Sequence, residues 1–171
     1  MKRIWLIILN CCLPIFTLQA QTMLETVNEL DLDRYQGIWY EIARLPNGFE
    51  KDLNNVTATY LNQPNGKISV LNKGAKPDGK VKSAKGRAWR PNKDRPGRLK
   101  VSFFWPFSGD YYVLKLDADY QYALVGSPSR KYLWLLARES EIPVSVYQEY
   151  IDYAEFQGFK INNLLKVEHS N

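Results

Sequence analysis

The chain has 171 residues, with 23 lysines and arginines, 18 acids and one histidine, and a net charge of +5. This length suits one domain with a sizeable core. Because the only histidine, His169, lies next to the C-terminus, the sequence excludes a histidine triad, a zinc cluster and a histidine-ligated haem within the domain. No pair of carboxylates stands out as a general acid and base, so we expect no catalytic site, no metal and no cofactor.

Residues 1–20 have the layout of a secretory signal peptide. Lys2 and Arg3 precede a short apolar run, and Ala20 provides a small residue at a cleavage position. Cleavage after Ala20 would leave residues 21–171 as a single domain. This domain is expected in the periplasm or outside the cell.

Lipidation is the alternative fate of this segment. Cys11 and Cys12 are the only cysteines, and acylation of one of them would anchor the chain to a membrane. Asn10 is a poor match to the small residues preferred before a lipidated cysteine, so we predict a soluble chain that begins at Gln21. Such a chain would have no thiol and no disulfide, despite its oxidising destination.

Eight short alternating segments follow at fairly even spacing. They are separated by turn residues such as Pro64-Asn65-Gly66 and Pro77-Asp78-Gly79, where proline and glycine supply the backbone angles of tight turns. Many short strands with regular turns predict an antiparallel sandwich or barrel rather than βαβ units. The predicted strands are 38–44, 56–61, 67–72, 81–89, 98–104, 111–117, 122–126 and 132–138.

The basic residues gather in the middle of the chain, in 73–100. Such a cluster could serve as a patch for nucleic acid or for an anionic membrane. Because a secreted protein rarely meets nucleic acid, we favour two lysine-rich edge strands, whose charges discourage pairing between sheet edges. No nucleic-acid partner is therefore expected.

Residues 143–157 are expected to form an amphipathic helix after the last strand. Tyr147, Tyr150, Ile151 and Ala154 recur at helical spacing, with a proline at the start and a glycine after the end. The polar face carries acids instead of the lysines of a helix that lies on a membrane. We therefore expect the helix to pack on the outside of the sheet.

Three short motifs occur in the order in which lipocalins carry them. Gly37-Ile38-Trp39 begins the first strand, Ala118-Asp119-Tyr120 precedes the seventh, and Arg138 ends the eighth. With the following helix, this pattern resembles the lipocalin family, and in particular the bacterial outer-membrane lipocalins and animal apolipoprotein D. Two departures are Ala118, where threonine is usual, and the lack of a recognisable lipobox.

The resemblance implies an all-β fold, an eight-stranded antiparallel up-and-down barrel with one C-terminal helix packed outside. The barrel would hold a lipophilic ligand, such as a fatty acid or a lysophospholipid, without catalysis. A loop over 47–55 would lie across the mouth as a lid, and the Arg138 guanidinium would lie over the Trp39 ring at the floor. The signature residues expected to be structural are Gly37, Trp39, Asp119, Tyr120 and Arg138.

Side-chain alternation selects the residues that would line the lumen. In the segment 111–117 two sets stay open, either Tyr112 and Leu114 or Tyr111 and Val113. Glu41 shares the face of Trp39, and its carboxylate would be costly there unless it is paired, protonated or turned away by a bulge. The predicted ligand-binding residues are Phe49 in the lid and Ala58, Tyr60, Val70, Val101, Phe103, Trp134 and Leu136 in the strands.

Two other functions stay open from the sequence. A lipocalin-type isomerase resembling the best-known one would require a thiol in the pocket, which the mature chain would lack. An envelope interaction module could dock through the aromatic stretch 103–107, although we expect those residues first at the rim of the pocket. Association with the outer membrane and a homodimer also stay open.

Overall fold

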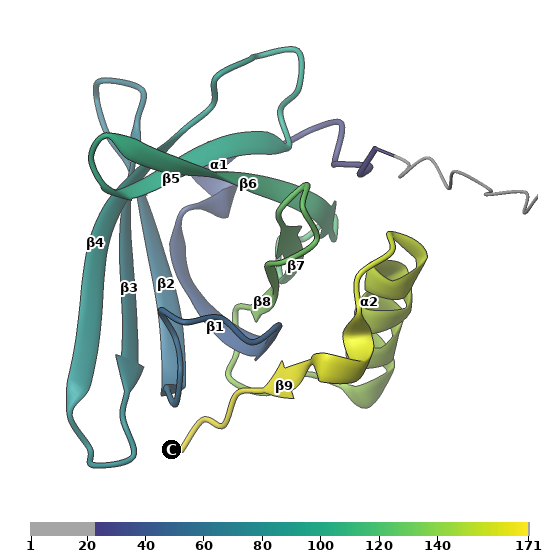
Figure 1. Cartoon of the computed structure of the whole chain (residues 1–171). Coiled ribbons are helices and arrows are strands. Elements are labelled where there is room, and N and C mark those ends of the chain that lie inside the picture. Colours follow the sequence, from purple (N-terminus) through teal and green to yellow (C-terminus); the bar gives the residue numbers. More distant parts are fainter. Residues whose placement is uncertain (1–22, 171) are drawn as a thin grey trace, which may run out of the picture.

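Eight antiparallel strands close into an up-and-down barrel, as Figure 1 shows for a computed structural model of the chain. The structure describes residues 23–170, so the predicted signal peptide and both cysteines lie outside the described residues. Each strand pairs with the next in sequence, and β1 pairs with both β2 and β8. The predicted eight-stranded antiparallel barrel is therefore confirmed.

The observed strands agree with the predicted ones to within a few residues. β6 begins earlier than expected because its pairing with β5 continues to the hairpin turn, where Phe104 faces Phe107. The barrel strands are β1 (Gly37–Arg44), β2 (Asn54–Asn62), β3 (Ile68–Ala75), β4 (Val81–Trp89), β5 (Arg98–Phe104), β6 (Phe107–Leu116), β7 (Tyr122–Gly126) and β8 (Leu133–Ala137).

Three small elements were not predicted. The one-turn helix α1 (Leu32–Tyr35) begins at Asp31, whose carboxylate accepts hydrogen bonds from the next turn. The 3₁₀ turn η1 (Ile161–Asn163) leads to the two-residue strand β9 (Leu165–Lys166), which pairs with the end of β1. These elements are too short to produce a periodic pattern in the sequence.

The predicted amphipathic helix is α2 (Val144–Phe156), and it packs outside the barrel as expected. Its buried face, formed by Tyr150, Ile151 and Ala154, lies on outward side chains of β7 and β8 such as Leu124 and Leu135. The barrel wall is therefore covered on this side by a second apolar layer. Within residues 23–170, no helix is both long and apolar enough to cross a bilayer.

The prediction of lysine-rich edge strands was wrong for most of the segment 73–100. β3 and β4 are inner members of a closed sheet, each paired on both sides. The pairing of β4 with β5 is nevertheless short and covers only Arg87–Trp89. Only the first part of β4 therefore retains the character of an edge.

The antiparallel order determines which loops share an end of the barrel. Since β1 runs from α1 toward the lid loop 45–53, the turns 76–80, 105–106 and 127–132 lie at the lid end. The turns 63–67, 90–97 and 117–121 lie with α1 at the opposite end. We refer to these as the lid end and the floor end.

Candidate ligand-binding site in the barrel

All eight barrel strands contribute apolar side chains to one buried cluster inside the barrel. Seven of the eight predicted ligand-binding residues belong to it or pack against it, the exception being Phe49. In β6 the inward residues are Tyr111 and Val113, whereas Tyr112 and Leu114 face α2 outside. The predicted residues of this lining are Ala58, Tyr60, Val70, Val101, Phe103, Trp134 and Leu136.

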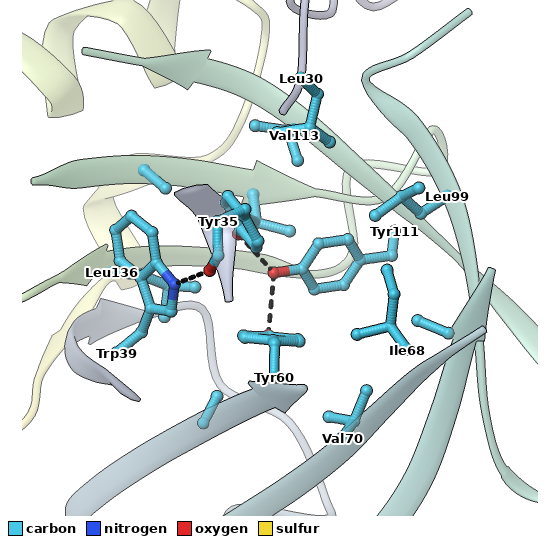
Figure 2. Close-up of a cluster of buried hydrophobic side chains, with 14 of the residues drawn as sticks. Leu30, Tyr35, Trp39, Tyr60, Ile68, Val70, Leu99, Tyr111, Val113 and Leu136 are labelled. Atoms are coloured by element: carbon cyan, nitrogen blue, oxygen red, sulfur yellow. Dashed lines mark hydrogen bonds between the residues drawn. The ribbon is translucent and has the colours of Figure 1, made fainter. Parts of the chain in front are cut away.

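A chain of three tyrosine hydroxyls crosses this cluster, as Figure 2 shows. The Tyr111 hydroxyl lies 2.8 Å from that of Tyr35 and 2.9 Å from that of Tyr60. Burial raises the pKa of all three phenols, so the hydroxyls stay protonated. The three hydroxyl groups have three protons, and the two hydrogen bonds between them use two. The third O–H can therefore donate to another polar group.

The floor is built around Trp39, which is fully buried. Its indole nitrogen donates to the Tyr35 carbonyl oxygen at 2.8 Å, and the Arg138 guanidinium lies 3.9 Å from the centre of its ring. Arg138 also donates to backbone carbonyl oxygens of α1 and β1, including those of Arg34 and Ile38. Arg138 thus links α1 and the start of β1 to the floor of the barrel.

Gly37 is required at the start of β1 for two reasons. Its φ is +100°, in the region that side chains rarely adopt, and a Cβ there would lie 3.3 Å from Nη1 of Arg138. A larger residue would both strain the backbone and press on the guanidinium. The glycine in the first motif therefore allows the close approach of Arg138.

The second motif forms the turn between β6 and β7. The Tyr120 hydroxyl accepts from the Asp31 amide at 2.9 Å, and the Arg34 guanidinium lies 4.2 Å from the centre of the Tyr120 ring. The Asp119 amide donates to the carboxylate of Asp117, which also accepts from two later amides of the turn. Tyr120 fastens α1, whereas Asp117 organises the turn itself.

The lid loop 45–53 contacts the barrel through aromatic rings. Phe49 stacks against Trp134, with ring centres 6.5 Å apart, and lies 5.4 Å from Tyr132. Phe49 is half exposed, so one face of its ring is toward solvent. The structure thus brings the predicted lid residue Phe49 next to the predicted lining residue Trp134.

A buried polar cluster fastens the lid from below. Nη1 of Arg44 donates to Glu41 at 2.7 Å, and Nη2 donates to the backbone carbonyl oxygens of Glu50 and Leu53, each at 2.9 Å. The Trp134 indole donates to the Glu50 carboxylate at 2.9 Å. We call Glu41, Arg44, Glu50 and Trp134 the lid latch.

A bulge in β1 explains how Glu41 and Arg44 come to lie on one side. The pairing with β8 shifts register between Glu41 and Ala43, so Ile42 and Ala43 both face the outer apolar layer. The bulge did not turn Glu41 away from the lumen, as one of the predicted possibilities required. It brought Arg44 to the carboxylate as its partner.

The latch contains two carboxylates for one guanidinium. Burial and the Glu50 carboxylate raise the pKa of Glu41, Arg44 lowers it, and the net result is a pKa of about 8. Glu41 therefore keeps its proton near neutral pH. This proton limits the negative charge that the lid covers.

The free energy of unfolding should fall as the pH rises toward 8, because of Glu41. Between its ordinary pKa of 4.5 and about 8, the unfolded chain loses a proton that the native chain keeps. The slope from this group approaches about 1.4 kcal/mol per pH unit, and it vanishes below and above that range. Urea unfolding of the native protein and of Glu41→Gln across this range should show the slope in the native protein alone.

A second substitution, at His169, removes another titratable group next to Glu41 from this measurement. The His169 ring nitrogen Nε2 lies 2.9 Å from the Glu41 carbonyl oxygen, so this ring contacts the residue under test. His169→Gln should therefore be present in both proteins. If the slope is equal in the two proteins, the retained proton belongs to a group other than Glu41. Glu50 is then the first residue to substitute.

Sequence reasoning missed most of the latch and part of the tyrosine chain. Arg44 has the wrong parity for a lumenal residue if β1 is regular, and Glu50 lies in a loop without a pattern. Tyr35 precedes the first predicted strand. The one available signal was Glu41, since an acid on the face of Trp39 requires a partner.

Three comparisons relate this chain to known proteins. The family model described as a Lipocalin-like domain matches residues 30–169. The "Outer membrane lipoprotein Blc" of Vibrio cholerae is 40% identical over 174 residues, covering 98% of this chain and 99% of the relative. Apolipoprotein D of Cavia porcellus is 38% identical over 149 residues, covering 82% and 78%.

A solved structure supports the same conclusion at the level of fold. Insecticyanin from the tobacco hornworm Manduca sexta superposes with a TM-score of 0.69 at 20% identity, covering 86% of this chain and 85% of that chain. The barrel, the motifs that build its floor and the family match together establish that this chain belongs to the lipocalin family.

Proposed function

We propose that this lipocalin binds and carries a lipophilic small molecule in its barrel, without catalysing a reaction on it. The observation that carries the proposal is the apolar lining, to which all eight strands contribute beneath a latched lid. Each buried methylene of an alkyl chain gains about 0.8 kcal/mol, so a long acyl chain binds tightly without many polar contacts. A fatty acid, a lysophospholipid or a similar lipid suits this lining.

The lining also contains one polar site among its buried residues. The chain of Tyr35, Tyr111 and Tyr60 has an O–H to spare, which can donate to a carbonyl or hydroxyl oxygen of a ligand. No thiol is available in residues 23–170 for isomerase chemistry, since both cysteines precede this range. This favours binding over catalysis.

The protein is proposed to act in the cell envelope, either free in the periplasm or held at the outer membrane by an acyl group. The name of the Vibrio cholerae relative supports the anchored form. Intact-mass analysis of protein from its native host separates the two. A chain starting at Gln21 is the free form, whereas a start at Cys11 or Cys12 with the added mass of a diacylglycerol is the anchored form.

Native mass spectrometry of the purified protein, followed by extraction of any bound lipid, tests the proposed function. We expect a lipid that co-purifies, or one acyl ligand taken up per chain when fatty acid is added. Bound ligand should also quench the fluorescence of Trp134. A folded protein that neither carries nor takes up an acyl ligand would falsify the carrier function.

Trp134→Ala should weaken acyl-chain binding about tenfold or more while the barrel stays folded. The substitution removes a lining ring, its stack with Phe49 and its hydrogen bond to Glu50. Titration with a fluorescent fatty acid measures the affinity, and circular dichroism confirms the fold. Tyr132→Ala is the matched control, because Tyr132 stacks on Trp134 but does not belong to the buried cluster.

A further inference from the structure

Three aromatic side chains project from the hairpin between β5 and β6. Phe104, Trp105 and Phe107 are 79%, 75% and 77% exposed, in a chain whose other large side chains are mostly packed. We call these three residues the aromatic tip. The hairpin lies beside the middle of β4, and Trp105 folds back along the outside of that strand toward Trp89. Neighbouring exposed rings of this kind mark an interaction surface.

A basic face adjoins the aromatic tip. The strand register places Lys73, Lys85 and Arg87 on the outside of β3 and β4, opposite the inward Val70 and Ala88. We call Lys73, Lys85 and Arg87 the basic face. The Arg87 guanidinium lies 4.9 Å from the centre of the Trp105 ring, which joins the face to the tip.

An open groove follows this junction. It has a volume of about 600 Å³ and is lined by Lys67, Arg87, Trp89 and Trp105. Two indole rings and two cations thus share one hollow on the outside of the barrel, away from the lumen. Rings and cations together suit the interface of a bilayer, where an aromatic body meets an anionic headgroup.

Charge is strongly polarised between the two sides of the molecule. From Lys67 to Phe107 the chain holds twelve lysines and arginines against two acids, whereas the remainder holds eleven against sixteen. The helix α2, on the other side of the barrel from β3 and β4 in Figure 1, carries Glu149, Asp152 and Glu155. A negatively charged surface therefore orients the molecule with the basic face toward it.

We propose that the aromatic tip and the basic face dock the barrel on the surface of an anionic phospholipid bilayer. The three rings would enter the boundary between headgroups and acyl chains, and the lysines would lie on the anionic headgroups. A second copy is disfavoured as the occupant, because it would bring two strongly basic faces together. This inference goes beyond the proposed function, since it needs neither a lumenal ligand nor an acyl anchor.

The basic side of the barrel also contacts the lid. Nζ of Lys82, on β4, donates to the Phe49 carbonyl oxygen in the lid at 2.6 Å. The basic strand that would contact the lipid surface is therefore hydrogen-bonded to the loop that covers the lumen.

Vesicle flotation with the chain from Gln21 onward tests the proposal, because this form has no acyl group and includes all of residues 23–170. We expect at least about tenfold more binding to vesicles of phosphatidylcholine with phosphatidylglycerol than to phosphatidylcholine alone, and less binding as salt is added. Equal binding to both vesicles, or none to either, overturns the proposal.

Matched variants assign the binding to the surface. The triple change of Phe104, Trp105 and Phe107 to serine should abolish flotation without unfolding, since all three side chains are exposed. The control changes Val144 and Phe156 to serine, which are 83% and 76% exposed on α2, and it should float as the native protein does. Flotation of the tip variant at the native level contradicts the proposal.

The charge contribution has its own pair of variants. Lys73→Glu with Lys85→Glu should reduce binding to anionic vesicles, whereas Lys131→Glu with Lys160→Glu, exposed elsewhere, should change it little. Equal losses in both pairs would mean that net charge acts without this face. Trp134→Ala should lose ligand affinity and keep flotation, so failure of the carrier function and failure of docking are distinguishable.

A different occupant would be recognised in the same experiments. Sedimentation that shows a dimer in the native protein and a monomer in the tip variant, with no flotation of either, would assign the tip to a second copy. That result would overturn docking on a bilayer.

Discussion

Trp39→Ala is expected to lower the free energy of unfolding by about 3–5 kcal/mol, the range for truncating a large buried ring. The substitution would leave a cavity beside Tyr35 and remove the surface beneath the Arg138 guanidinium. It would also leave the Tyr35 carbonyl oxygen without the indole donor. Urea unfolding, monitored by circular dichroism because an indole is lost, measures the change.

The contrast with ligand affinity makes this prediction specific to the floor. Trp39 lies at the opposite end of the barrel from the lid, so folded Trp39→Ala should bind an acyl ligand with nearly native affinity. Ile38→Ala is the control, because the neighbouring side chain is half exposed and should cost little. Equal effects of Trp39→Ala on stability and on affinity would mean that floor and binding site are not separate.

Arg44→Met is expected to destabilise the protein by a similar amount, about 3–5 kcal/mol, because removing one member of a buried charged cluster leaves the other polar groups without their hydrogen bonds. Glu41 would lose its partner, and the carbonyl oxygens of Glu50 and Leu53 would lose their donor. The lid should open more often as a result. Ligand dissociation should therefore accelerate, as measured by stopped-flow displacement of a fluorescent fatty acid.

A double substitution distinguishes the effect of an unpartnered Glu41 carboxyl group from that of lost packing. Glu41→Leu combined with Arg44→Met removes both members of the pair and should recover much of the lost stability. The lid carbonyls would still lack their donor, so fast dissociation should persist. If the double variant is as unstable as Arg44→Met alone, the unpartnered Glu41 carboxyl group is not the cause of the loss.

The fold could be predicted because strand alternation and turn residues agree along most of the chain. In β5 and β8 inward and outward side chains alternate over the residues that line the lumen. Leu99, Trp134 and Leu136 lie inward as expected. The helix was recognisable because Pro143 and Gly158 frame an apolar stripe. The three motifs then distinguished a barrel from a sandwich, which alternation alone could not do.

The candidate site was less predictable where the strands are irregular. β1 and β6 each shift register against a neighbour, at Glu41–Ala43 and at Val113–Lys115, and a shift reverses the face of the residues that follow. The partner of Glu41 and the inward set of β6 could therefore not be read from periodicity. The lid contacts of Glu50 depend on how a loop folds back, which local sequence does not encode.

In the part of the chain that the structure describes, only one side of the barrel wall is covered by a helix, so the two sides should differ in how readily they open. The wall formed by β7 and β8 is backed by α2 and is stiffened by two apolar layers. On the other side β4 is a single layer, and its pairing with β5 extends over only Arg87–Trp89. Those amides of 81–86 that point toward β5 have no strand partner there and should exchange with solvent long before the amides of β7 and β8, so the β4–β5 seam is the least supported part of the wall.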